Sequence, residues 1–217
     1  MLNHIVLFFV AIGIGIVGAI IGWELSTVII LIVALTLLNI SYYLYIILAS
    51  QNIKKIEKVI QTNKKDPMYA YLIALKNENI DEVIEQIDKL TQKYKQPKYV
   101  NSYALIKEIL TNNYDRAREL ATEIKDTEIG QYSLALVGAY TGNGDKYLHT
   151  NFNKPWMNDA IKATHYFAIG EKDLYEKHRD LAIATSKGIQ LASNIYTFNI
   201  SEKYYEFGKY NKNEENS

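Results

Sequence analysis

The chain of 217 residues contains no cysteine and only three prolines. The absence of cysteine excludes disulfide bonds and thiolate metal sites. The 24 basic residues are balanced by 24 acidic ones, which argues against a nucleic-acid-binding protein, because such proteins usually carry a basic excess on one face. The abundance of Lys, Asn, Ile and Tyr suits a helical protein from a bacterium with an AT-rich genome.

Charge is also almost missing from the first 50 residues, where Glu24 is the only charged side chain. Two apolar stretches, residues 2–22 and 26–49, lie on either side of it. A helix rises about 1.5 Å per residue, so each stretch can cross a hydrocarbon core about 30 Å thick. We therefore predict two transmembrane helices that form a hairpin with its turn at Trp23 and Glu24. The N-terminus lacks the lysine or arginine of a cleaved signal peptide.

Small and polar residues in these stretches indicate how the two helices pack. Gly15, Gly18 and Gly22 lie in the first stretch and Asn39 lies in the second. Small residues let helices approach closely in lipid, where apolarity alone cannot drive association. The favoured interpretation is packing within the hairpin, and the alternative is a homodimer formed through the first helix.

Residues 51–66 are predicted to form a basic juxtamembrane helix. Lysines that stay on the cytoplasmic side of the membrane set the orientation of a span, so we expect both termini to be cytoplasmic. The segment either continues the second span or lies against anionic lipid. Its membrane-surface candidates are Lys54, Lys55, Lys58, Lys64 and Lys65.

Residues 67–210 are predicted to form a cytosolic all-α domain, followed by a disordered tail at 211–217. The segment Asn79-Ile80-Asp81 recurs 34 residues later as Asn113-Tyr114-Asp115. Apolar residues at helical spacing lie on both sides of each segment, and Asn or Asp suits the first residue of a helix. Weaker copies follow, with Asn143 thirty residues after Asn113 and a last corner near Asp173.

The segments "NENIDEVIEQIDKL" and "NNYDRARELATEI", with their 34-residue period, resemble the tetratricopeptide repeat. This resemblance extends loosely over residues 67–187 and implies about four stacked helix pairs, because one pair cannot bury its apolar face alone. The signature tryptophan and terminal proline of the family are absent, so an unrelated helical bundle is the alternative. The segment after Gly188 is expected to cap the stack.

The resemblance also implies a concave surface for a protein or peptide partner, lined by the first helix of each pair. Tyrosine is frequent at interfaces, and fifteen of the 18 tyrosines follow residue 50. For each of these side chains taken singly, packing in the core is the favoured role, and partner binding is the alternative. The candidate partner-binding residues are Tyr69, Tyr71, Asn77, Tyr99, Tyr103, Lys107, Tyr132 and Trp156.

Sequence patterns for catalysis are not found. His149, His165 and His178 lack metal-ligand spacing, and no glycine-rich phosphate loop precedes a helix. We therefore predict no enzyme activity, cofactor or metal, although catalysis would be reconsidered if His165 and His178 met carboxylates in one cleft.

These patterns together predict a membrane-anchored adaptor or scaffold that presents a cytosolic helical-repeat surface. The alternative function is an accessory or regulatory subunit of a membrane transporter or membrane enzyme, acting through its transmembrane hairpin.

Overall fold

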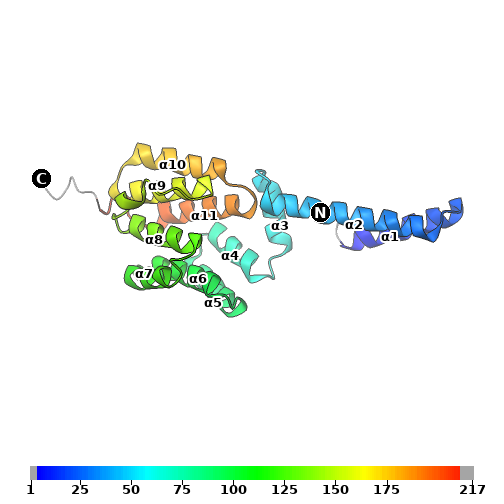
Figure 1. Ribbon diagram of the computed structural model, residues 1–217, viewed down its shortest axis with the longest axis horizontal. Helices are drawn as coiled ribbons and strands as arrows, with labels where there is room; N and C mark the ends of the chain where they lie inside the picture. The colour runs from blue at the N-terminus through cyan, green and yellow to red at the C-terminus, as the bar shows by residue number, and fades with distance from the viewer. Residues whose placement is uncertain (1–3, 211–217) are drawn as a thin grey trace, which may run out of the picture. The chain divides into compact units, whose positions relative to one another are not determined.

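The computed structural model describes residues 4–210, so the predicted tail at 211–217 lies outside the described residues. Within this range the chain forms eleven α-helices and one short 3-10 helix, without strands, which confirms the all-α prediction (Figure 1). The structure divides into two compact units. Of the described residues, the first unit comprises 4–59 with Lys187–Ile189, and the second comprises 60–186 with 190–210.

The first unit contains α1 (His4–Ile21), α2 (Leu25–Leu48) and the beginning of α3 (Ile53–Thr62). The chain reverses between α1 and α2 at Gly22, whose φ of 76° is readily adopted by glycine. The Trp23 amide donates a hydrogen bond to the Gly18 carbonyl at 2.8 Å. A Cβ at Gly18 would lie 2.6 Å from Val28 of α2, so this glycine allows α1 and α2 to pack closely.

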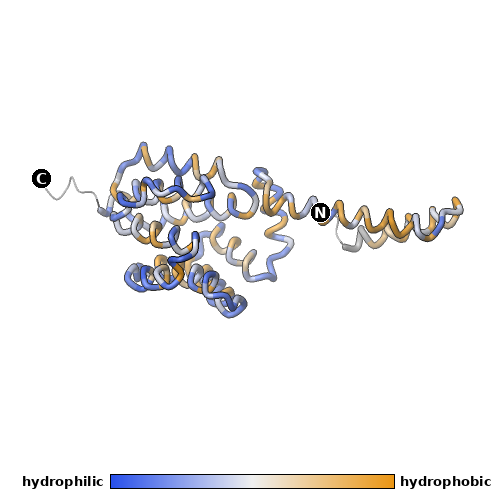
Figure 2. The backbone as a smooth tube through the Cα atoms, in the orientation of Figure 1, coloured by the Kyte–Doolittle hydropathy of each residue, from blue (hydrophilic) through white to orange (hydrophobic). Residues whose placement is uncertain are grey.

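The described structure supports one membrane span rather than the two that we predicted. Leu25–Leu48 is 24 residues long, apolar and almost wholly exposed, and Figure 2 shows the hydrophobic colours along it. The described apolar part of α1, Phe8–Ile21, is shorter than the roughly 20 residues that cross a hydrocarbon core. Length and composition therefore identify α2 alone as a candidate span among the described residues.

The second unit is a succession of helices in which each packs on the next. The three prolines, Pro67, Pro97 and Pro155, are each the first residue of a helix, where the missing amide costs nothing and the fixed φ suits the helix. The helices of this succession are α4 (Pro67–Lys76), α5 (Ile80–Lys93), α6 (Pro97–Leu110), α7 (Tyr114–Glu123), α8 (Glu128–Tyr140), α9 (Pro155–Ile169) and α10 (Lys172–Thr185).

Four corners of the second unit share one backbone conformation. Glu78, Asn112, Gly142 and Gly170 all have positive φ, between 53° and 81°. Their separations of 34, 30 and 28 residues equal the spacings seen in the sequence. After each of them an amide donates back to the carbonyl five residues earlier, which is the Schellman arrangement that ends a helix. These bonds join Asn79 to Ala74, Asn113 to Glu108, Asn143 to Gly138 and Glu171 to Tyr166.

The residues that follow the corners differ in how they begin the next helix. Asn79 caps α5 as predicted, because its Oδ1 accepts a hydrogen bond from the Glu82 amide at 3.2 Å. Asn113 instead donates its side-chain amide to Glu108 at 2.8 Å and does not cap α7. After Gly142 only the 3-10 helix η1 (Asp145–Tyr147) forms, so α8 has no long partner helix before α9 begins.

The last helix, α11 (Gly188–Tyr204), is buried along most of its length. We expected a cap with one polar face, but residues 190–201 are mostly covered on all sides. Ser201 lies 3.3 Å from the Tyr140 hydroxyl of α8, and Phe198 contributes to the core around α9. α11 is therefore an inner helix of the second unit.

The segment that leaves α11, residues 203–210, reaches all four corners. The Tyr204 hydroxyl donates to the Glu78 carbonyl at 2.6 Å, and the Tyr205 hydroxyl donates to the Ile109 carbonyl at 3.2 Å. The Gly208 amide donates to the Phe167 carbonyl at 2.9 Å. Tyr210 lies over Gly142, where an added Cβ would approach it to 2.6 Å. The C-terminal segment thereby ties the ends of the helix pairs together.

The left-handed conformation at Asn112 gives a stability test. Alanine in this conformation costs about 1 kcal/mol or more, whereas glycine adopts it freely. Both substitutions remove the 3.0 Å hydrogen bond from the Tyr114 hydroxyl to the Asn112 side chain. The difference between the stabilities of the two variants therefore reports only the cost of the left-handed backbone conformation. We expect Asn112→Ala to be about 1 kcal/mol less stable than Asn112→Gly in chemical denaturation. Equal stabilities would contradict the corner geometry.

Candidate functional site

Tyrosines from successive helix pairs form a connected network. Tyr71 of α4 meets Tyr103 of α6 edge-on, with ring centroids 6.0 Å apart. Tyr94, at the end of α5, stacks on Tyr103 at 5.9 Å with an interplanar angle of 6°. Tyr94 also meets Tyr99 at 5.4 Å. Aromatic pairs at such distances stabilise packing beyond the area they bury, so this network holds the first two helix pairs together.

A second pair of tyrosines, Tyr140 of α8 and Tyr205, joins α8 to the segment after α11, with ring centroids 5.4 Å apart. Burial, helped by the neighbouring Tyr103 and Tyr140 hydroxyls, raises the pKa of Tyr71 well above its usual value. Burial and the neighbouring Tyr94 raise the pKa of Tyr103 to about 12. These hydroxyls are therefore neutral at physiological pH and act as packing groups that can also donate hydrogen bonds.

The inner side of the array, which the repeat resemblance assigns to a partner, is covered by α11 and the segment after it. Tyr205 packs with Leu105 and Ile109 of α6, Ser201 meets α8, and Phe198 joins the core around α9. Three helices that begin successive pairs thus contact the chain's own C-terminal part. A partner must use other surfaces while α11 occupies this position.

The predicted partner-binding residues differ in their exposure to solvent. Asn77 and Tyr99 are exposed, and Tyr103 and Lys107 are half-buried. Lys107 forms an ion pair with Asp88 at 2.7 Å. The remaining candidates are covered or packed in the core: Tyr69, Tyr71, Tyr132 and Trp156.

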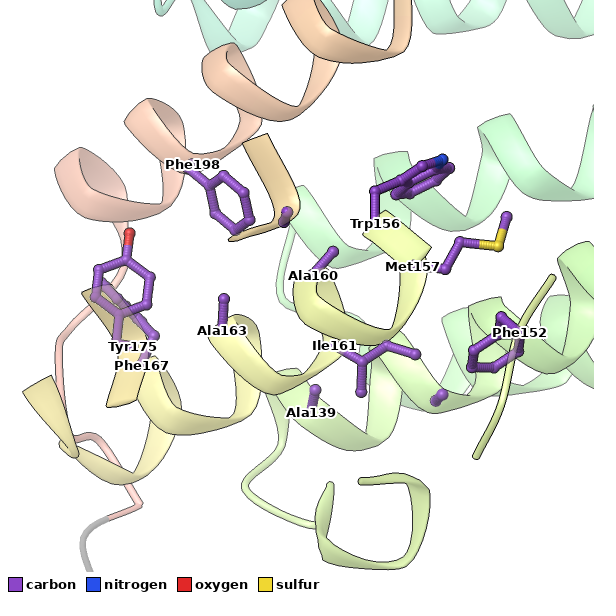
Figure 3. Packing of buried hydrophobic residues seen from close by; sticks show 12 residues of the cluster. Ala139, Phe152, Trp156, Met157, Ala160, Ile161, Ala163, Phe167, Tyr175 and Phe198 are labelled. Atoms are coloured by element: carbon purple, nitrogen blue, oxygen red, sulfur yellow. The ribbon is translucent and has the colours of Figure 1, made fainter. Parts of the chain in front are cut away.

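Tyr132 and Trp156 pack in the hydrophobic core. Their rings meet edge-on at 5.5 Å, and Tyr132 meets Phe152 at 5.9 Å. Figure 3 shows Trp156 and Phe152 within the buried cluster of α9, together with Met157 and Ile161. The segment around Pro155 therefore places its tryptophan in the core, where a partner cannot reach it in this conformation.

Sequence reasoning did not single out Tyr94, which connects Tyr99 with Tyr103, or the pair Tyr140 and Tyr205. Tyr94 follows α5, and Tyr205 follows α11. Neither position belongs to the first helix of a pair, so the repeat analogy gave no reason to select it. The spacing of residues within one helix or loop does not indicate which distant segment of the chain they contact.

The two membrane-related sets of residues occupy different environments. Lys54, Lys55 and Lys58 are exposed on α3, and Lys64 and Lys65 are exposed in the turn after it. Of the candidates for transmembrane packing, Gly18 lies against Val28 and Trp23, whereas nothing lies within 4 Å of a Cβ added at Gly15 or Gly22. Asn39 is half-buried on α2.

Two histidines of the second unit, His165 and His178, pair with separate carboxylates. Nε2 of the buried His165 lies 3.0 Å from Asp145, beside Gly144, where a Cβ would lie 2.6 Å from the imidazole. His178 lies 2.8 Å from Asp159. Among the described residues no group of three or more His, Asp or Glu side chains could hold a metal ion.

Comparison of the chain with protein-family models, curated proteins and solved structures finds no match.

The ion pair between Asp66 and Lys93, which lies beside the tyrosine network, should make the stability of the fold depend on pH. Burial alone would raise the pKa of Asp66, but hydrogen bonds from Lys93 and the Met68 amide hold this pKa below its usual value. A carboxyl with a lowered folded-state pKa stabilises the fold above its unfolded-state pKa, and the contribution is lost as the pH falls through the folded-state pKa.

Asp66→Asn keeps a side chain that can cap α4 and removes only the charge. We expect it to lower the free energy of unfolding at neutral pH by no more than about 1 kcal/mol, because the pair is well exposed. The difference from the natural chain should vanish as the pH falls through the lowered folded-state pKa of Asp66. Denaturation measured from neutral to acid pH tests it, with Asp126→Asn as the control, because Asp126 is exposed and takes part in none of the ion pairs found in residues 4–210. A difference that persists in acid would contradict the assignment.

Proposed function

We propose that this protein is a membrane-anchored adaptor or scaffold without catalytic activity. The observation that carries the proposal is α2, whose 24 residues are apolar around the whole helix and almost wholly exposed. Exposed apolar surface of this extent needs a cover, and a bilayer provides it. The second unit supplies a folded helical array that such an anchor would hold at the membrane.

In the proposed arrangement α1 accompanies α2 through the membrane as a two-helix hairpin, with Glu24 in the outer turn. Two observations support it: Gly18 allows close packing of α1 on Val28 of α2, and exposed lysines follow α2 on α3. Because lysine-rich segments stay on the cytoplasmic side, both termini would be cytoplasmic and the protein would be a multi-pass protein of the cell membrane.

We further propose that the second unit is a divergent tetratricopeptide-like array. The four equivalent corners support this assignment, since helix pairs closed by the same turn are the elements of such repeats. Because function inferred from fold is an analogy, the partner is defined only as a protein or peptide. With α11 covering the inner side, exposed Asn77 and Tyr99 are the accessible candidates for contact with it.

The alternative function, as an accessory subunit acting through the membrane hairpin, is favoured by one observation. Gly15 has open space where a side chain would lie, so its face of α1 is free to receive a helix of another membrane protein or of a second copy.

Anchoring is tested with a tag placed after Ser217 and extraction of isolated membranes with alkaline carbonate. We expect the full chain to stay in the membrane pellet and a variant lacking residues 1–50 to be released. Reporter fusions at Glu24 and at the C-terminus should report opposite sides of the membrane. Release of the full chain by carbonate, or a C-terminal reporter active outside the cytoplasm, would contradict the proposal.

The two functions are separated by photo-crosslinking from Asn77 and from Gly15 in native membranes, with Leu174 on α10 as the exposed control position. The adaptor function predicts one discrete product from Asn77 that is absent from Leu174. Discrete products from Gly15 alone would favour the subunit function and reject the adaptor.

A further inference from the structure

Two connecting segments of the second unit lie together, and we call them the basic loop pair: the turn at residues 63–66, and the connection between α5 and α6 taken with its flanking helix ends, residues 93–99. Asp66 in the first loop accepts a hydrogen bond from Lys93 of the second at 2.7 Å. The two loops contain five lysines and one aspartate. Because Asp66 is already paired with Lys93, the loops contain no carboxylate to balance the other four: Lys64, Lys65, Lys95 and Lys98.

These four lysines are all exposed. None of them takes part in an ion pair among those found in residues 4–210. Lys95 makes only a local hydrogen bond with the Gln92 carbonyl, at 3.2 Å. The positive charge of the basic loop pair is therefore available to an anionic partner.

Tyrosines accompany the lysines in the second loop. Tyr99 is 44% exposed, and the Lys98 ammonium lies 4.9 Å from the centre of its ring. Tyr94 packs against Tyr99 at 5.4 Å. A tyrosine ring has an apolar body and a polar tip, and together with lysine it suits the boundary between lipid headgroups and water.

The other end of the α4–α5 helix pair is acidic and not basic. The corner between α4 and α5 carries the carboxylates Glu78, Asp81 and Glu82, with Lys76 and Lys203 nearby. One end of this pair is thus strongly basic and aromatic while the other is weakly acidic. Such an asymmetry would turn only the basic end toward a negatively charged surface.

The first of the two loops also follows closely after the membrane segment in the chain. About fifteen residues separate the end of α2 at Leu48 from Asn63, and the intervening α3 carries three exposed lysines. We propose that the basic loop pair binds the headgroups of anionic phospholipids in the membrane that holds α2. This inference rests on the proposed membrane anchor and adds the lipid class and the residues that recognise it.

The test uses the full chain in lipid nanodiscs, either of phosphatidylcholine alone or with about one third phosphatidylserine. Hydrogen exchange of residues 93–103, followed by mass spectrometry, reports contact with lipid. We expect exchange to slow several-fold in the anionic discs, because each lysine near such a surface strengthens binding roughly fivefold. The effect should decrease steeply with added salt.

The double substitution Lys95→Gln and Lys98→Gln should abolish this difference, while the matched pair Lys172→Gln and Lys177→Gln, exposed on α10, should leave it intact. Equal exchange in both lipids, or a difference that survives the first pair, would overturn the inference while leaving the anchor in place. If the chain does not enter nanodiscs, the anchor fails. In that case, co-sedimentation with vesicles of the same two lipid compositions tests the inference. The inference requires that the chain bind the vesicles containing phosphatidylserine and not those of phosphatidylcholine alone.

Discussion

The left-handed corner is the constraint on which the second unit depends. Each helix pair reverses direction at one residue with positive φ, and the following amide closes the helix by bonding to a carbonyl five residues back. At two corners the residue is glycine, but at the first it is Glu78, a residue type that rarely adopts this conformation. Its carbonyl is held by Tyr204 and its carboxylate by Lys203. Tertiary contacts therefore offset the local strain.

The same contacts explain why the array buries so many tyrosines. α11 and the segment after it occupy the inner side of the helix pairs, and Tyr140, Tyr205 and Ser201 meet there. An open repeat array would leave this side to a partner. Here the chain fills the inner side itself, so most of the aromatic residues serve cohesion and interaction surfaces are confined to the outside and the loops.

The two units place their apolar side chains in different environments. α2 exposes apolar side chains along its whole length, which water opposes and lipid accepts. The second unit buries its apolar residues between helices and leaves lysines and carboxylates in water. An anchor joined to a folded array in this way is the physical basis of the proposed scaffold. The proposed lipid binding by the basic loop pair would extend membrane contact to the array.

The sequence by itself determined the all-helical class, the apolar front and the spacing of the corners, because helical periodicity, capping residues and uncharged runs are local signals. Asn79 and the prolines that begin α4, α6 and α9 are such local signals. It did not determine that α1 is shorter than a full span in the described residues, or that α11 would be an inner helix. It favoured core packing for Trp156 and Tyr71 but left partner binding open, and the structure covers both. Only the tertiary structure decided these points, because burial depends on which distant segment fills a given space, and residues 203–210 meet corners up to about 126 positions earlier in the chain.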